Sequence, residues 1–278
     1  MVFASWSLQI SLQAADAPEK PRTGKITIKG SDTMVILGQR WAETYMHHNP
    51  GTTVQITGGG SGTGIAALIN RATDICAASR PMSEKEHTLI KTKHGKEAKE
   101  IAVALDGLTI FLNKTNPAGP FSLGQLEAIY RGKITDWKDL GGAPGKIICY
   151  GRENSSGTCA YFKEHVLKKQ EFAIDVQSLP GTAAVINAVS KDVRAIGYGG
   201  IGFAKDVKII PISEKDGEQG FAPSMENVVS GVYPISRSLF FYTTDEPAGE
   251  IKAFIDWVLG DEGQKVCEQV GYYPVQKK

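Results

Sequence analysis

Cysteine and histidine are scarce in this sequence, and neither is spaced for metal binding or redox chemistry. There is no C-x-x-C pair, no H-x-x-x-H pair and no Cys/His cluster, so we expect neither a metal nor another cofactor. The four cysteines are too few and too dispersed for a disulfide framework. We expect free buried thiols at Cys76, Cys149, Cys159 and Cys267. The alternative is a single bridge, for which Cys149 and Cys159 lie closest in sequence.

An excess of positive charge is also missing. The chain has 31 Lys+Arg against 30 Asp+Glu, a formal net charge of +1, whereas proteins that bind nucleic acid or membrane surfaces usually carry a basic excess or stripe. No repeat or low-complexity tract is present, and the 31 glycines indicate many tight turns. With 278 residues, the chain is long enough for one large or two mid-sized domains. These features predict an ordinary globular protein without a nucleic-acid partner.

Long hydrophobic runs are absent too, and the N-terminal segment comes nearest to one. Residues 2–12 (VFASWSLQISL) are weakly apolar and precede small residues, as in the second half of a secretory signal, although no positive region comes first. The run is too short and too polar to span a bilayer. We expect residues 1–24 to be a leader of this kind; the alternative is a disordered or cloning-derived extension.

From Gly24 onward, segments typical of strands alternate with segments typical of helices, which predicts a parallel α/β fold. The expected strands are 26–29, 53–57, 74–78, 108–113, 147–150, 195–198, 207–212 and 239–243. The expected helices are 34–48, 65–70, 122–130, 158–167, 183–189 and 248–269, the last broken at Gly260, and a charged surface helix that begins at Ser83. Ser83 with Glu86 and Ser122 with Gln125 have the spacing of capping boxes. No linker divides the chain, so two domains would require crossings, for which 104–108 and 233–239 are the candidates.

Four of the predicted strand ends carry hydroxyl side chains, glycines or arginine. They are 30–34 (GSDTM), 58–64 (GGGSGTG), 78–81 (ASRP) and 152–158 (RENSSGT). Any one of them alone fits a helix cap or a tight turn. Together they lie where open α/β sheets bind ligands, and helix N-termini, hydroxyls and arginine all donate hydrogen bonds to anions. The four junctions therefore predict a site for a tetrahedral oxyanion.

Familiar phosphate and hydrolase motifs do not account for these junctions. Residues 59–64 are followed by Ile65 rather than the Lys of a Walker A loop. Residues 197–202 match G-x-G-x-x-G but leave no room for the helix that must follow, so we interpret them as a turn. Neither Ser61 nor Ser156 lies in G-x-S-x-G, and no histidine adjoins these loops. We therefore do not expect an enzyme.

Five motifs in order resemble the phosphate-binding protein of bacterial ABC phosphate importers, from about Lys25 to the C-terminus. They are GSDTM, GGGSGTG, TDI with the following SRP, IYRGKITDW at 129–137, and RENSSGT. The resemblance implies a two-lobed periplasmic binding protein-like fold of type II, with the anion site in the interlobe cleft. It implies a first lobe of residues 25–106 and 235–278 and a second lobe of residues 107–234.

The resemblance also implies the binding residues. They fall on Thr33, Met34, Ser61, Arg152, Ser156, Gly157 and Thr158, and the neighbouring residues Ser31, Asp32, Ser79 and Arg80 of the same loops complete the candidates. Ser79 departs from the family, in which an aspartate at this position accepts the proton of hydrogen phosphate and so disfavours sulfate. Arg80 would add positive charge beside it. Asp32 could supply the missing acceptor, or it could simply cap the helix that follows.

The function that the resemblance implies is capture of inorganic phosphate outside the cytoplasm and delivery to the membrane permease of an ABC importer. The chain would be a monomer, either periplasmic or secreted to the cell surface. Two other functions stay open: binding of another oxyanion such as sulfate, or of an organophosphate, and hydrolysis of phosphate esters with a cleft serine as nucleophile.

Overall fold

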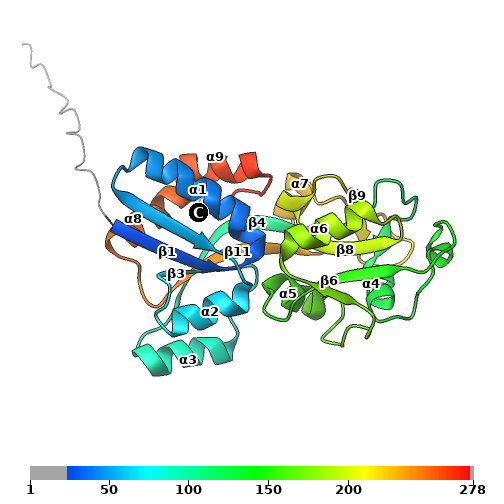
Figure 1. The fold of residues 1–278 in the computed structure, drawn as a ribbon, viewed down its shortest axis with the longest axis horizontal. Helices are drawn as coiled ribbons and strands as arrows, with labels where there is room; N and C mark the ends of the chain where they lie inside the picture. The colour runs from blue at the N-terminus through cyan, green and yellow to red at the C-terminus, as the bar shows by residue number, and fades with distance from the viewer. Residues whose placement is uncertain (1–23, 276–278) are drawn as a thin grey trace, which may run out of the picture.

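The computed structural model describes residues 24–275, so the predicted leader lies outside the described residues, Gly24 excepted. Figure 1 shows two lobes side by side along the long axis of the molecule. Two long strands connect the lobes, β4 (Lys99–Leu112) and β11 (Ser236–Thr243). This arrangement confirms the two-lobed α/β fold expected from the sequence.

The first lobe combines the N-terminal third of the chain with its C-terminal helices. Its elements are β1 (Gly24–Gly30), the 3-10 turn η1 (Asp32–Met34), α1 (Val35–His48), β2 (Thr52–Thr57), α2 (Ser61–Ile69), β3 (Ile75–Ala78), α3 (Glu84–His94), α8 (Gly249–Leu259) and α9 (Asp261–Val270). Gly260 separates α8 from α9, as predicted. Both hydrogen bonds of the capping box of α3 are present, between Ser83 and Glu86, as predicted.

The second lobe is built from the middle of the chain. Its elements are β5 (Phe121–Ser122), α4 (Leu123–Tyr130), η2 (Trp137–Leu140), β6 (Ile148–Arg152), α5 (Gly157–His165), β7 (Gln177–Leu179), α6 (Gly181–Lys191), β8 (Ala195–Gly200), η3 (Ile201–Phe203), β9 (Lys208–Ile210), β10 (Ile212–Ser213) and α7 (Met225–Val229). The predicted capping box of α4 is also formed, between Ser122 and Gln125.

One curled sheet runs through both lobes, in the order β2-β1-β3-β11-β4-β8-β6-β7, with β9 also paired to β4. β1 is parallel to β2 and β3, but β11 and β4 are antiparallel to each other and to their outer neighbours. The all-parallel expectation is therefore wrong. The strands that join the lobes carry the chain out of one lobe and back, so they run in opposite directions. Residues 99–107, the first half of β4, were not predicted because charged Lys99, Glu100 and Asp106 interrupt their apolar pattern.

Each lobe has its own hydrophobic core, and the cores meet within the two connecting strands. The main first-lobe cluster includes Ala104 of β4 and Leu239 of β11. The main second-lobe cluster includes Leu108 of β4 and Ile235, just before β11. The chain therefore passes from one hydrophobic core to the other within residues 104–108 and again within residues 233–239, the two segments predicted as crossings. The exact residue boundaries of the lobes stay a prediction.

The glycines of 197–202 do not form the turn predicted for them. Residues 195–200 are the buried strand β8, and the first turn of a 3-10 helix follows. A Cβ on Gly197 would lie 2.6 Å from Val185 Cγ1, and one on Gly199 would lie 2.5 Å from Thr182 Cγ2. These glycines therefore let α6 pack closely on the sheet.

All four cysteines are free, as expected. Burial raises the pKa of Cys149 and of Cys267 to about 12, so these thiols stay protonated near neutral pH.

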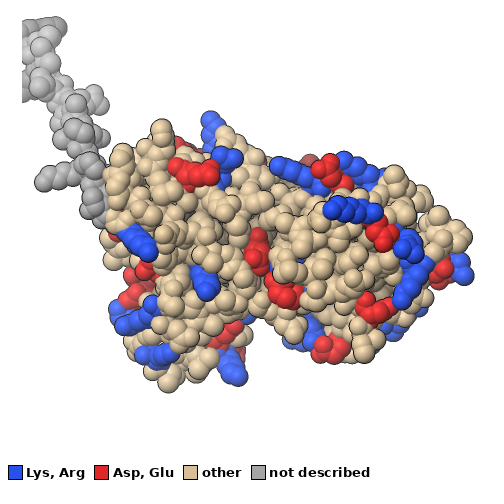
Figure 2. Space-filling view, in the orientation of Figure 1, with Lys and Arg blue, Asp and Glu red and all other residues tan. Residues whose placement is uncertain are grey.

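Within residues 24–275, no helix is long and apolar enough to cross a membrane, and no group of three or more His, Cys, Asp or Glu side chains is placed to hold a metal ion. On the face drawn in Figure 2, basic and acidic side chains are interspersed over both lobes rather than gathered into one basic area.

Candidate functional site

The predicted junctions meet between the lobes, where four hydroxyl side chains form a buried group that we call the hydroxyl cluster. Its members are Thr33, Ser61 and Ser79 of the first lobe and Thr158 of the second, each no more than 1% exposed. Thr33 Oγ1 lies 2.8 Å from Thr158 Oγ1. Ser79 Oγ lies 3.3 Å from Ser61 Oγ and 3.4 Å from Thr158 Oγ1. Side chains up to 125 positions apart in sequence thus make one polar site.

Two helices begin at the cluster because glycines bring their first turns close to the opposite lobe. α2 starts after Gly60, whose φ of 92° suits glycine. A Cβ on Gly60 would lie 2.5 Å from the carbonyl oxygen of Ser155. Next to it, the N–H of Gly62 donates to that same oxygen across the cleft, at 2.9 Å. The loop 58–64 is therefore a surface for close contact with the second lobe.

The N-terminus of α5 supplies the second-lobe side of the site. Ser156 caps the helix by accepting a hydrogen bond from the N–H of Cys159 at 3.3 Å, which leaves its own hydroxyl proton available. The N–H groups of Gly157 and Thr158, in the first turn, have no acceptor within the helix. A Cβ on Gly157 would lie 2.2 Å from Ser61 Oγ and 2.8 Å from Ser79 Oγ. The positive end of α5 therefore lies directly against the first-lobe hydroxyls.

Arg152, at the end of β6, holds the charged part of the site. Its side chain is 1% exposed. The guanidinium donates to Thr182 Oγ1 at 2.7 Å, to Glu153 at 2.8 and 3.1 Å, and across the cleft to Asp32 at 2.9 Å. Burial opposes the ionisation of Glu153, but the hydrogen bonds and charge of Arg152, together with backbone N–H donors, outweigh it and lower the pKa of this carboxyl. Both carboxylates therefore balance the buried arginine.

Asp32 has a role that the sequence did not predict. One carboxylate oxygen accepts from Arg152, and the other accepts from the N–H of Gly59 at 2.9 Å. The alternative that Asp32 caps its own helix is wrong, because no side chain caps η1 or α1. The carboxylate instead connects two loops of the first lobe to the arginine of the second. A further role as acceptor for a ligand proton stays a prediction.

Arg80 follows Ser79 but does not donate to the hydroxyl cluster. It forms a two-fold ion pair with Glu86, with N–O distances of 2.7 and 2.8 Å, and donates to the carbonyl of Pro81. The positive charge that we expected beside Ser79 is therefore paired with Glu86, in the capping box of α3.

Two other candidates near Thr33 do not reach the cluster. The Met34 side chain lies in the first-lobe core, and the Ser31 N–H bonds to the carbonyl of Ala77 at 2.8 Å. η1 therefore places Thr33, rather than these neighbours, in the cluster.

Arg237 of β11 reaches the cluster and was missed in the sequence. It lies opposite Asp106 in the β4–β11 register and donates to that carboxylate at 2.7 and 2.9 Å. It also donates to the Ser79 carbonyl and to Thr158 Oγ1, both at 3.1 Å. The only signal in the sequence was a charged residue inside a predicted crossing segment. Its partner Asp106 is 131 positions away, so no local pattern indicated the pair.

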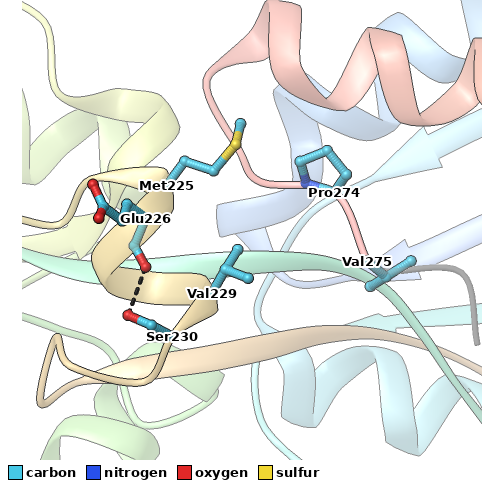
Figure 3. Close-up of a pocket in the computed structure, with 6 residues that line it drawn as sticks. All are labelled: Met225, Glu226, Val229, Ser230, Pro274 and Val275. Atoms are coloured by element: carbon cyan, nitrogen blue, oxygen red, sulfur yellow. Dashed lines mark hydrogen bonds between the residues drawn. The ribbon is translucent and has the colours of Figure 1, made fainter.

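Two cavities lie outside the hydroxyl cluster. One of about 870 Å³ lies between the start of α3 and α5, and its lining includes Arg80, Tyr161 and Arg237. The other, of about 790 Å³, lies between α7 and the segment after α9 (Figure 3). Met225, Val229, Pro274 and Val275 line it, together with Glu226 and Ser230. This second cavity is mainly apolar and shares no residue with the hydroxyl cluster, so it is not the predicted anion site.

Comparison with known proteins shows the family to which the chain belongs. Residues 15–262 match the family model described as a PBP superfamily domain. The chain is 33% identical over 273 residues to the phosphate-binding protein PstS of Pseudomonas aeruginosa, covering 92% of this chain and 84% of that protein. It is 32% identical over 261 residues to PstS of Bacillus subtilis, covering 92% of this chain and 83% of that protein.

A solved structure gives the same result for the fold. A phosphate ABC transporter substrate-binding protein with bound phosphate, from Clostridium perfringens, superposes with a TM-score of 0.83 and 29% identity, covering 91% of this chain and all of that one. Family match, sequence identity and fold therefore agree with the two-lobed arrangement. The chain belongs to the phosphate-binding proteins of bacterial ABC phosphate importers, within the PBP superfamily.

Proposed function

We propose that the chain binds one inorganic phosphate between its lobes and delivers it to the membrane permease of an ABC importer. The observation that carries this proposal is the hydroxyl cluster, which is buried and contributed by both lobes. Hydroxyl groups, the free N–H groups of a helix N-terminus and one arginine are suited to a small tetrahedral anion. The curated relatives are named phosphate-binding proteins, which supports the choice of ligand.

The binding residues proposed from the geometry fall on both sides of the cleft. Thr33, Ser61 and Ser79 bind from the first lobe, and Ser156, Gly157 and Thr158 bind from the second. Arg152 supplies positive charge from behind them. Phosphate oxygens replace the direct hydrogen bond between Thr33 and Thr158 with bonds through the ligand. The ligand then holds the lobes together, and β4 and β11 act as the hinge by which they open.

Transport rather than catalysis is the role that fits these contacts. Among residues 24–275, none of the four cluster hydroxyls is hydrogen-bonded to a histidine or carboxylate that could act as a base. The relatives are binding proteins that serve transporters. We propose that this chain works in the same way, as a monomer outside the cytoplasm.

Titration calorimetry of the full chain, after dialysis to remove bound anions, tests this function. We expect one phosphate per chain, bound more tightly than glycerol phosphate, because every proposed contact is a hydrogen bond or a charge from a buried group and an organic substituent would leave part of that set unpaired. A chromogenic phosphate ester incubated with the same sample should release no product. Absence of phosphate binding, or tighter binding of the ester, would contradict the proposal.

A further inference from the structure

Tyr272, in the segment after α9, reaches the loop that carries Thr33. It is 1% exposed, and its hydroxyl oxygen lies 2.6 Å from the carbonyl oxygen of Thr33. A carbonyl has no proton to give, so the tyrosine hydroxyl must be the donor. Burial, and after it the nearby Asp106 carboxylate, raise the pKa of Tyr272 well above its ordinary value. The hydroxyl therefore keeps its proton, and this hydrogen bond persists, throughout the neutral pH range.

The backbone on both sides of Tyr272 is anchored. Gly271, with a φ of 94°, ends α9, and the N–H of Tyr272 donates to the carbonyl of Cys267 at 3.1 Å. On the other side, the N–H of Tyr273 donates to the carbonyl of Leu105 at 3.0 Å, and the N–H of Leu105 donates back at 2.7 Å. The tyrosine ring is thus carried by a segment that is fixed both to a helix and to the connecting strand β4.

Glycines of the second lobe close the space around the tyrosine ring. A Cβ on Gly202 would lie 2.4 Å from Cε2 of Tyr272. A Cβ on Gly200 would lie 3.0 Å from the tyrosine hydroxyl oxygen and 2.7 Å from Cγ2 of Thr33. The end of β8 and the start of η3 therefore pack directly on both partners of the hydrogen bond. With the lobes in this arrangement, the packing hinders the ring from swinging away from Thr33.

Thr33 relies on this distant contact because its own loop offers little local support. η1 has only three residues, and neither Ser31 before η1 nor Met34 before α1 makes a side-chain cap hydrogen bond. The backbone dihedrals of this short turn set the direction of both the carbonyl and the side chain of Thr33, so a bond that fixes the one constrains the other. The side chain must be placed closely, because Thr33 Oγ1 lies 2.8 Å from Thr158 Oγ1 across the cleft.

We propose that Tyr272 is a positioning residue of the anion site: its hydroxyl holds the carbonyl of Thr33 and so places the Thr33 hydroxyl for contact with the anion. The inference rests on the proposed function, in which Thr33 binds phosphate from the first lobe. Tyr272 acts through Thr33, because its single proton is already donated to the carbonyl and none is left for an anion. The effect of removing the tyrosine hydroxyl should therefore depend on the presence of the Thr33 hydroxyl.

The test is a double-mutant cycle measured by titration calorimetry with inorganic phosphate. Its four proteins are the wild type, Tyr272→Phe, Thr33→Val and the double variant. Phenylalanine keeps the buried ring and removes only the donor. Tyr272→Phe should weaken phosphate binding at least about twofold, the lower end of coupling between residues in contact, but by no more than Thr33→Val does. In the Thr33→Val background, the same change should leave the affinity nearly unchanged.

Tyr233→Phe is the matched control. Tyr233 is also 1% exposed, and its hydroxyl also donates to a backbone carbonyl, that of Leu108 at 2.7 Å. Both residues belong to the second-lobe core. We expect this variant to lose thermal stability as Tyr272→Phe does, because each loses one buried hydrogen bond, but to keep wild-type phosphate affinity. A melting curve for each variant then separates a loss of stability from a loss of positioning.

The outcomes separate the inference from the proposed function. Wild-type affinity in Tyr272→Phe would overturn the inference alone. An equal loss with and without the Thr33 hydroxyl would also overturn it, because Tyr272 would then act independently of Thr33. The same loss in Tyr233→Phe would do so too, because any buried tyrosine hydroxyl would then matter equally. Wild-type protein that binds no phosphate would instead contradict the proposed function itself.

Discussion

Replacing Arg152 with alanine is expected to weaken phosphate binding by about 2 to 4 kcal/mol, the cost typical of truncating one member of a buried charge pair. The structure gives two reasons for so large an effect. The substitution removes the buried guanidinium from the site, and it leaves Asp32 and Glu153 without the cation that both of them contact. Those carboxylates then repel the incoming anion. Calorimetry with phosphate at constant ionic strength measures the effect.

The control for this variant is Arg131→Ala, because Arg131 also forms an ion pair, with Glu127 at 2.7 Å, but at the end of α4. Its phosphate affinity should equal that of the wild type. If Arg152→Ala also bound phosphate as tightly as the wild type, Arg152 would have no part in the site. Far-UV circular dichroism and a melting curve would show that the variant is folded.

Replacing Gly157 with alanine is expected to keep the lobes apart. The added Cβ would lie 2.2 Å from Ser61 Oγ, far inside contact distance, and both sides of this contact belong to helix first turns packed in their own lobes. The strain is most easily relieved by opening the cleft. We expect phosphate affinity to fall roughly 5- to 150-fold, which corresponds to an overpacking cost of about 1 to 3 kcal/mol.

Small-angle scattering makes this prediction specific. Saturating phosphate should reduce the radius of gyration of the wild type, and it should reduce that of Gly157→Ala less. Gly124→Ala is the control, because Gly124 lies in the first turn of α4 and a Cβ there would meet nothing closer than 3.6 Å. A Gly157→Ala protein with unchanged affinity and the same compaction would rule out close approach of the lobes at this residue.

The sequence was sufficient to predict which loops meet at the site. Thr33, Ser61 and Ser79 follow parallel strands of the first lobe whose carboxyl ends lie at one edge of the sheet, so their approach follows from the order of the elements. Thr158 follows β6 of the second lobe, and the resemblance to a two-lobed binding protein predicted that it faces them across the cleft. The caps at Ser83 and Ser122 were predictable for a similar reason, since both partners lie within three residues. Local patterns therefore defined the hydroxyl side of the site.

The charged side of the site depends on contacts between distant segments. From the sequence, Arg80 could pair with a ligand or with Glu86. It pairs with Glu86 because of where α3 packs in the fold. Asp32 meets Arg152 because the lobes approach each other across 120 positions of sequence. Arg237 meets Thr158 because of the β4–β11 register and the position of α5. No local pattern fixes such partners, so the sequence identified the charged residues only in part.

The claim that one phosphate is held by both lobes is tested most directly by calorimetry on Thr33→Val and Thr158→Val, one variant from each lobe. Valine keeps the shape of threonine and removes only the hydroxyl group, so each variant isolates one proposed contact with the anion. We predict that both variants bind phosphate about 10- to 150-fold more weakly than the wild type, as for the loss of one hydrogen bond to a charged group. Wild-type affinity in either variant would contradict the account, because the threonine replaced in that variant would then make no contact with the ligand.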